Sequence, residues 1–210
     1  MKKNSRILPP QIQETELADF QPQDEETFEN LKFLETDRSR SIVKNLIIRQ
    51  SSLEKITMTN SRLERFEAAN VIFEKCDFSN SELLGASIHQ AEFRQCRLIG
   101  TNFSESWLRD VRFDDCLLDY ASFATTNLKS VAFTNNRLRF AEFYDIDWQN
   151  LQLTENDLHD TGWLRTQLKG LSFVSNRFER IGISADQLRG LMVEPTQALI
   201  IAAGLGLIID

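Results

Sequence analysis

A five-residue repeat of large apolar side chains runs through most of the chain. Counting in fives from Phe28 to Val193 gives 34 positions, and all but Arg38 and Ala68 hold Phe, Leu, Ile, Val, Met or Trp. Residues five apart in a helix are rotated by about 140°, so they would form no single face. A strand has a period of two, so alternate members of the repeat would point to opposite sides. The chain must therefore turn within every five-residue unit.

A twenty-residue repeat is superimposed on the first one. Four units then form one coil, with the large residue and the small residue two before it pointing inward and the other three facing solvent. Coils joined by backbone hydrogen bonds rise about 4.8 Å each, so about eight coils give a rod of roughly 40 Å. The sequence predicts an all-β solenoid from 28 to 183 in which like residues stack. The predicted columns are Cys76, Cys96, Cys116, Asn136, Asn156, Asn176; Phe73, Phe93, Phe113, Phe133, Leu153, Phe173; and Phe103, Phe123, Phe143, Trp163.

The cysteines and asparagines belong to the small inward column, and we predict a structural role for both. A metal site would need convergent thiolates and a fourth ligand, whereas stacked residues form a line. Buried cysteines behave as small apolar residues, and buried asparagines must form hydrogen bonds, which indicates an amide ladder. His89 and His159 fall at outward positions far apart in the sequence, and no Ser-His-Asp grouping is present. We therefore predict no metal, no cofactor and no enzyme activity.

Both ends of the chain leave the repeat. Residues 1–27 are predicted to form an irregular or partly helical leader that packs on the first coil, because a solenoid end exposes unpaired backbone. Residues 184–210 are predicted to form a helix over about 195–203 and a strand over Leu205–Ile209 that cap the last coil. The helix is apolar nearly all round, so a two-fold dimer through this end is expected. The expected interface residues are Val193, Leu199, Ile200, Ile201, Leu205, Leu207 and Ile209. A less regular coil or a bulge is expected between Arg38 and Ala69, because Arg38 and Ala68 interrupt the large apolar column.

The composition points to an acidic protein of the cytoplasm. The formal net charge is -7, which gives no basic footprint for direct nucleic-acid binding. The start of the chain has no long apolar run typical of a signal peptide, and the apolar stretch 198–209 is too short to cross a bilayer. The three cysteines are an odd number, which favours free thiols in a reducing compartment.

The five-residue pattern resembles the pentapeptide-repeat family, whose consensus is A(D/N)LXX. The segments that carry the resemblance are Ala91-Glu92-Phe93, Thr101-Asn102-Phe103, Ala121-Ser122-Phe123, Thr126-Asn127-Leu128 and Ala141-Glu142-Phe143. The resemblance covers about three quarters of the chain and implies a right-handed, quadrilateral β-helix. The tail is similar to the capping element of the Qnr and MfpA type, whose members dimerise through it. The unbroken repeat leaves no room for the projecting loops of some Qnr proteins.

Two outward features are candidates for partner binding. Residues 141–160 hold six carboxylates and no Lys or Arg. Either they form an acidic belt for a basic partner surface, or neighbouring coils neutralise them, with Asp157 near Arg137 and Arg177 and Asp145 near Arg165. Tyr120 and Phe140 share one outward column, which can either anchor an interface or simply stabilise the sheet. The candidate partner-binding residues are Trp107, Asp114, Asp115, Tyr120, Phe140, Tyr144, Asp145, Asp147, Asp157 and Asp160.

Two functions therefore compete at this stage. The resemblance to Qnr and MfpA implies a DNA mimic that occupies the DNA-binding saddle of gyrase or topoisomerase IV and alters supercoiling and quinolone susceptibility. The alternative is a scaffold that binds an unrelated protein, because a fold alone does not assign a function.

Overall fold

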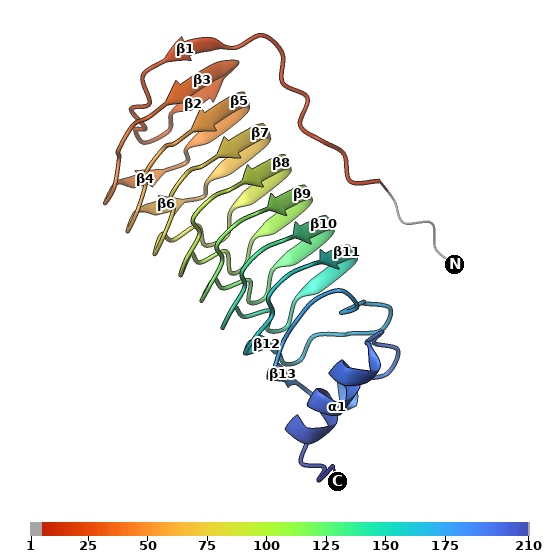
Figure 1. Cartoon of the computed structure of the whole chain (residues 1–210). Helices are drawn as coiled ribbons and strands as arrows, with labels where there is room; N and C mark the ends of the chain where they lie inside the picture. The colour runs from red at the N-terminus through yellow and green to blue at the C-terminus, as the bar shows by residue number, and fades with distance from the viewer. Residues whose placement is uncertain (1–5, 210) are drawn as a thin grey trace.

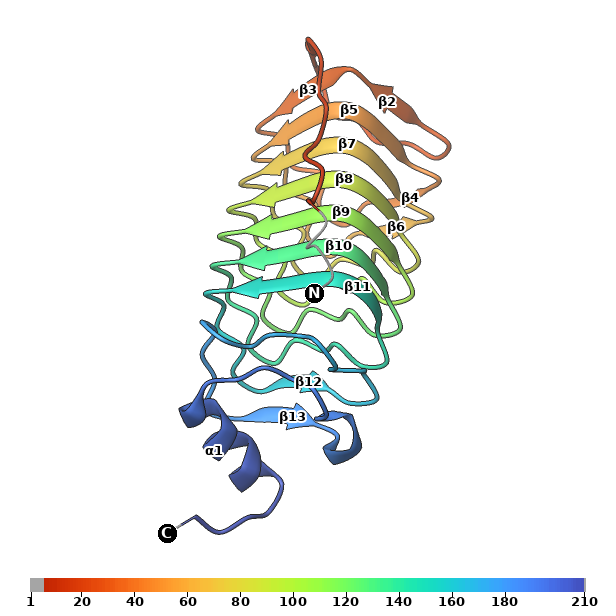
Figure 2. The same cartoon turned by 90° about the vertical axis from the view of Figure 1, so that its right-hand side faces the viewer.

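The computed structural model describes residues 6–209 and shows a straight stack of coils (Figures 1 and 2). About eight turns follow one another along the axis, and from β2 to β13 the paired strands are parallel with a register of twenty residues, as in Val111↔Val131. The predicted all-β solenoid is confirmed. No helix within residues 6–209 is long and apolar enough to cross a membrane.

The strands of the described chain form one large sheet and two small ones. The large sheet has the order β1-β3-β5-β7-β8-β9-β10-β11, and β2 pairs with β5; β4 pairs with β6, and β12 with β13. The bounds are β1 Glu16–Ala18, β2 Thr27–Glu29, β3 Leu31–Leu34, β4 Ile42–Lys44, β5 Ile47–Glu54, β6 Arg62–Glu64, β7 Glu67–Glu74, β8 Ser87–Arg94, β9 Trp107–Asp114, β10 Asn127–Thr134, β11 Asp147–Thr154, β12 Thr161–Trp163 and β13 Ile181–Ile183.

Left-handed backbone residues explain how the chain turns in every unit. Every fifth residue from Glu25 to Ser175 has a positive φ, and all but three of these corner positions hold a residue other than glycine. Asn and Asp, which tolerate this conformation better than other side chains, occupy many corners. Because the corners follow one another without a gap, the repeat contains no inserted loop between 25 and 175, as the sequence predicted.

The interior consists of stacked side chains, and the predicted columns are confirmed. Phe93 and Phe113 lie with their ring centroids 4.9 Å apart and nearly parallel, and Phe143 stacks on Trp163 at 4.2 Å. The three cysteines are buried free thiols, and the Cys116 Sγ donates to the Phe93 carbonyl at 3.2 Å. Burial raises the pKa of Cys96 well above its usual value, which makes this thiol unreactive.

The expected irregular coil between Arg38 and Ala69 is absent, so this prediction was wrong. The Arg38 amide donates to the Thr57 carbonyl at 2.7 Å, and the corner residues continue through this segment. Arg38 lies in the first coil and is half-exposed, so its side chain needs no place in the core. In this unit the usual order of sizes is reversed: Phe66 occupies the inward position that is usually small, and Ala68 occupies the one that is usually large. Both are buried, so the total core volume of the unit is kept.

The leader covers the first coil and then runs back along the outside of the rod. Phe20 is fully buried against Phe28 and Phe33, and the short β1 pairs with β3. Figure 2 shows the preceding segment, which we call the strap (residues 6–13), crossing the large sheet toward β9. The packing on the first coil is as predicted; the described leader contains no helix, and the sequence did not predict the strap.

Side chains of the large sheet hold the strap in place. The Leu8 amide donates to Asp110 Oδ1 at 3.2 Å, and the Gln11 amide donates to Asn70 Oδ1 at 3.0 Å. Arg112 Nη2 donates to the Ile7 carbonyl at 3.1 Å. Ile7 is buried, although it lies outside the main core cluster. The strap therefore lies over the charged residues Asp110 and Arg112 of β9.

The C-terminal end is closed by the short helix η1 Ala185–Gln187 and by α1 Pro195–Gly204. Pro195 opens α1, in agreement with the predicted helix, and a reciprocal pair of hydrogen bonds between Glu194 and Gln197 caps it. Gln197 Nε2 also donates to the carbonyls of Phe173 and Asn176, which fixes the helix to the last coil. The predicted strand over Leu205–Ile209 is wrong: the helix ends in a turn at Gly206, which has φ +94°, and no strand follows within the described residues.

Candidate protein-interaction surface

Tyr120 and Phe140 form an exposed stacked pair on one edge of the rod. Their ring centroids lie 4.9 Å apart with an angle of 4° between the planes, and the edge of Phe140 meets His159 at 6.4 Å. Tyr120 is 61% exposed and Phe140 is 40% exposed. The predicted outward column is thus confirmed, and we call this pair the aromatic ridge.

The backbone under the aromatic ridge is unusual. Both residues occupy corner positions with φ 59°, and they are the only large apolar residues among the corners from 25 to 175. The left-handed conformation costs an ordinary side chain roughly 1–2 kcal/mol, and bulky residues are rarely found there. Neither ring contributes to the core. Two aromatic side chains at unfavourable exposed positions, stacked on each other, are therefore better explained by a surface role than by folding.

The aromatic ridge borders a side of the rod with few charges, which we call face A (residues 102–104, 122–124, 142–144 and 162–164). Ser122, Glu142 and Gly162 stack in register through parallel bridges. The second outward column of this face includes Ala124 and Tyr144 and ends at Leu164, which is 45% exposed. Tyr144 does not reach the ridge; its ring instead faces the Arg165 guanidinium at 5.7 Å. The ridge and face A together form a surface on which Tyr120, Phe140 and Leu164 are the exposed large apolar or aromatic side chains, next to small polar residues and Glu142.

Three of the six carboxylates in the expected acidic belt, those of Asp145, Asp157 and Asp160, form ion pairs with arginines of neighbouring coils. Asp157 is buried and accepts from Arg139 Nε at 2.8 Å and from Arg177 at 3.3 Å. Burial by itself would raise the pKa of Asp157, but Arg139, the His159 amide and Arg177 outweigh it and hold this pKa below its usual value. The Asp157–Arg177 pair is as predicted, whereas the Asp157–Arg137 pair is not formed.

Ion pairs also form diagonally, between alternate outward residues of adjacent coils. Arg137 Nε lies 2.5 Å from Asp119 Oδ2. Arg137 is stacked on Leu117, and Asp119 lies two residues further along that coil. Asp145 lies 3.8 Å from Arg165, as predicted, and Asp160 lies 2.8 Å from Arg180. The hydrogen bond from Arg180 lowers the pKa of Asp160. The structure therefore favours neutralisation over a continuous acidic stripe.

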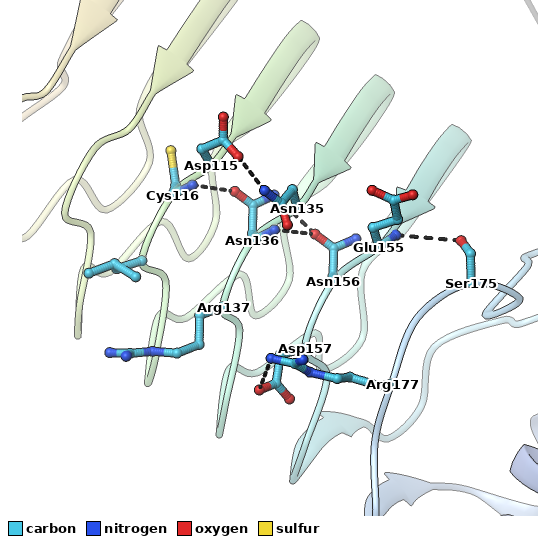
Figure 3. Close-up of a pocket in the computed structure, with 11 residues that line it drawn as sticks. Asp115, Cys116, Asn135, Asn136, Arg137, Glu155, Asn156, Asp157, Ser175 and Arg177 are labelled. Atoms are coloured by element: carbon cyan, nitrogen blue, oxygen red, sulfur yellow. Dashed lines mark hydrogen bonds and ion pairs between the residues drawn. The ribbon is translucent and has the colours of Figure 1, made fainter.

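A polar groove of about 440 Å³ follows the cysteine and asparagine column (Figure 3). Asp115, Asn135, Glu155 and Ser175 line one side, and the amide ladder runs behind them. The Asn135 amide bonds to Asp115, and the Glu155 amide donates to Ser175 Oγ at 3.4 Å. Asp115 thus uses part of its hydrogen-bonding capacity within the rod, and it occupies the corner that precedes the corner of Tyr120.

The remaining candidate residues lie on other sides of the rod. Trp107 begins β9 and is 62% exposed, and Asp147 begins β11, where it accepts from Asn127 at 3.0 Å. Asp114 ends β9 with a half-buried carboxylate whose pKa is raised by burial. The structure therefore brings together only part of the predicted set. In residues 6–209 no group of His, Cys, Asp or Glu side chains could hold a metal ion.

Sequence reasoning missed one feature beside this surface, a glycine of face A and the glycine stacked on it in the next coil. Gly162 and Gly182 occupy a column that holds Ser122 and Glu142 in earlier coils. A pair of glycines twenty residues apart, at positions where the backbone requires none, was the available signal.

Comparison with known proteins agrees with the coil geometry. The family model described as the pentapeptide repeat region matches residues 65–116 and 86–163. No curated protein matches the sequence.

Solved structures with similar coils include several repeat proteins of low sequence identity. A trypsin-treated form of QnrB1, described as a plasmid-mediated fluoroquinolone resistance protein, is 18% identical, with a TM-score of 0.47 over 92% of this chain and 95% of that chain. HetL from Nostoc sp. strain PCC 7120, described as involved in heterocyst differentiation regulation, is 15% identical, with a TM-score of 0.33 over 80% and 87%. A thylakoid-lumen pentapeptide repeat protein from Arabidopsis thaliana is 19% identical, with a TM-score of 0.22 over 60% and 67%. Similarity at this level says nothing about what this chain binds.

Proposed function

We propose that this chain, which matches the pentapeptide-repeat family model over residues 65–116 and 86–163, is a non-enzymatic rod that binds another protein through the aromatic ridge and face A. The observation that carries the proposal is the stacked Tyr120–Phe140 pair, which is exposed at two left-handed corners. Aromatic side chains are enriched among the residues that dominate protein interfaces. The three buried free thiols suit a reducing compartment such as the cytoplasm.

The proposal is tested with a double variant that keeps the corners favourable. Tyr120→Asn and Phe140→Asn place a residue that tolerates positive φ at both positions, so the fold should be retained or stabilised. Trp107→Asn is the matched control, because Trp107 is equally exposed on another side and the next coil has Asn127 in its column. Partners captured by the full chain are identified by mass spectrometry, purified and titrated calorimetrically against all three proteins.

We expect the double variant to bind the purified partner at least about tenfold more weakly, and the Trp107 variant to bind it like the wild type. Equal affinity of the double variant and the wild type would remove the aromatic ridge from the interface and the proposal with it.

A second and more specific candidate function is binding to gyrase or topoisomerase IV as a mimic of DNA. The uninterrupted rod without inserted loops and the net charge of -7 support it. The ion pairs of Asp157 and Asp160 count against it, because a mimic of phosphates needs carboxylates that are free for basic side chains. A supercoiling and quinolone-cleavage assay with purified protein in excess decides the matter: inhibition or protection supports this candidate, and unchanged enzyme activity excludes it.

We also propose that two copies join through the C-terminal end. Ile201 is buried on the last coil, and Val193 and Ile200 are half-buried, so these residues serve the cap. The residues left for a second copy are exposed and apolar, namely Leu199, Leu205, Leu207 and Ile209. Apolar residues gathered at one end of a rod are typical of an interface, and a two-fold arrangement would cover both copies at once.

A further inference from the structure

A pocket of about 620 Å³ lies where face A meets the C-terminal helix. Its floor is formed by Gly162 and Gly182, whose Cα atoms stack in β12 and β13. Ile181 and Leu164 line it from the coils, and Ile200 of α1 lines it from the helix. Leu164 also belongs to face A, so the pocket continues the proposed interaction surface.

The backbone conformation does not require glycine at either position of the floor, so the room above the backbone is the feature to consider. Neither Gly162 nor Gly182 has a positive φ, so other residues could adopt this backbone. A Cβ at Gly162 would lie 2.1 Å from Glu142 Oε2, which means that the carboxylate lies directly over the glycine. A Cβ at Gly182 would meet only ordinary contacts, the nearest at 3.6 Å, so folding does not require this glycine. Glycine in a strand weakens it and often marks a close approach from outside.

The charges of the pocket leave one sign unbalanced. The Glu142 carboxylate has no hydrogen bond or ion pair to any residue in 6–209, and burial raises its pKa. Asp160 is paired with Arg180 at 2.8 Å, whereas Glu179 adds a carboxylate without an ion pair among the described residues. Anionic groups are therefore repelled, and a cation would gain a partner that the fold does not supply.

We propose that this pocket binds a cationic side chain on an aliphatic stem, an arginine or lysine of the protein that docks on face A. The inference rests on the proposed protein-binding function and names the chemistry of the partner at one point. The stem packs between Ile181 and Ile200, as long cationic side chains do on apolar surfaces. The charged head lies over the glycine floor beside Glu142, and a flat guanidinium fits such a floor best.

Small probes test the pocket without the partner. Butylguanidinium, butylammonium, the neutral butylurea and the anionic valerate are titrated into the full chain, and amide shifts of the glycines are followed by two-dimensional NMR. Glu142→Gln removes the charge with little change of shape, and Glu105→Gln is the control, because Glu105 is an exposed carboxylate at a corner of the same rod.

We expect both cations to shift the amide signals of Gly162, Gly182 and Gly204, and butylurea and valerate to leave them unchanged. In the Glu142 variant the dissociation constant for butylguanidinium should rise by about tenfold, with no rise in the Glu105 variant. The proposal of cation binding is overturned by any one of three results: no shifts with the cations, equal shifts with butylurea, or unchanged affinity in the Glu142 variant.

The outcome is separable from that of the proposed function. Probe binding does not involve the aromatic ridge, so Tyr120→Asn with Phe140→Asn should leave it intact while weakening the partner. If the ridge variant loses the partner and the cations fail to bind, the pocket inference falls and the proposed function remains. If the cations bind and the ridge variant keeps the partner, the cation pocket stands and the proposed function of the aromatic ridge falls.

Discussion

Replacing Asn156 by alanine should destabilise the rod more than any surface change, because this residue is the centre of the buried amide ladder. Asn156 Nδ2 donates to the Phe133 carbonyl at 2.9 Å and to Asn176 Oδ1 at 2.9 Å. Its Oδ1 accepts from the Asn136 amide at 3.0 Å, and the residue is fully buried. The side chain thus joins three coils.

The expected magnitude follows from the groups that lose a partner. In Asn156→Ala the Asn136 amide loses its acceptor, and the Phe133 carbonyl loses a donor, both in the interior. Each buried group without a partner costs about 1–3 kcal/mol, so the free energy of unfolding should fall by roughly 2–6 kcal/mol. Against a total stability of about 5–15 kcal/mol this is a large fraction.

The matched control is Cys116→Asn, which extends the ladder by one coil. The Cys116 amide already donates to Asn136 Oδ1 at 2.7 Å, and the Cys116 thiol donates to the Phe93 carbonyl, so the new amide would find the same partners. Urea unfolding followed by circular dichroism should place this variant within about 1 kcal/mol of the wild type. A loss below about 1 kcal/mol for Asn156→Ala would refute the reasoning, since it would mean that the interior amides need no partners.

Four further changes have defined outcomes. Thr125 is a β-branched residue with φ 53°, so Thr125→Asn should raise the urea midpoint, corresponding to roughly 0.5–1 kcal/mol, and a lower midpoint would contradict the corner argument. Ile7→Asp should release the strap, so that hydrogen exchange quickens at its amides and at β8 and β9 but not at β11; unchanged exchange would show that the strap does not depend on this buried residue. The lowered pKa of Asp157 means that its stabilisation is present above the pKa of the unfolded chain and is lost as the pH falls through the folded value; Asp157→Asn should therefore cost about 1–3 kcal/mol at neutral pH and little in acid, and a loss independent of pH would be inconsistent with the ion pair with Arg139. Leu205→Asp should convert a sedimenting dimer to a monomer, and the dimer proposal fails if the mass does not change.

The core could be predicted from the sequence because its geometry follows from period alone. A side chain that recurs every twenty residues must meet its own kind, so the stacks of Phe93 on Phe113 and of Asn136 on Asn156 required no knowledge of the partner strands. Register is the strongest constraint in such a fold, since a slip by one residue would turn every inward side chain outward. The expected irregularity near Arg38 failed for the opposite reason: the backbone ladder, and not the side chain at one position, maintains the coil.

The outer surface was predictable only within one column. Tyr120 and Phe140 share a column and therefore stack, but Arg137 selects Asp119 and Arg139 selects Asp157 across neighbouring columns. A long side chain can pair with a residue of its own column or of a neighbouring column. The twenty-residue period does not predict which of the two it selects. The acidic run in 141–160 consequently looked like a belt in the sequence, whereas in the structure basic residues of the adjacent coils neutralise much of it.

The strap shows where periodicity gives no information at all. Its hydrogen bonds are made by its backbone groups, which carry no sequence signal, and Ile7 is the one fully buried side chain among residues 6–13. Its docking site uses Asn70 of β7 and Asp110 and Arg112 of β9, and nothing in the repeat distinguishes these positions from other outward ones. The corners of the aromatic ridge differ from the strap, because the repeat itself predicts their backbone conformation: every fifth residue from 25 to 175 has a positive φ. Once each fifth residue is known to be left-handed, an aromatic residue at that position can be recognised from the sequence as a residue that the fold itself does not need.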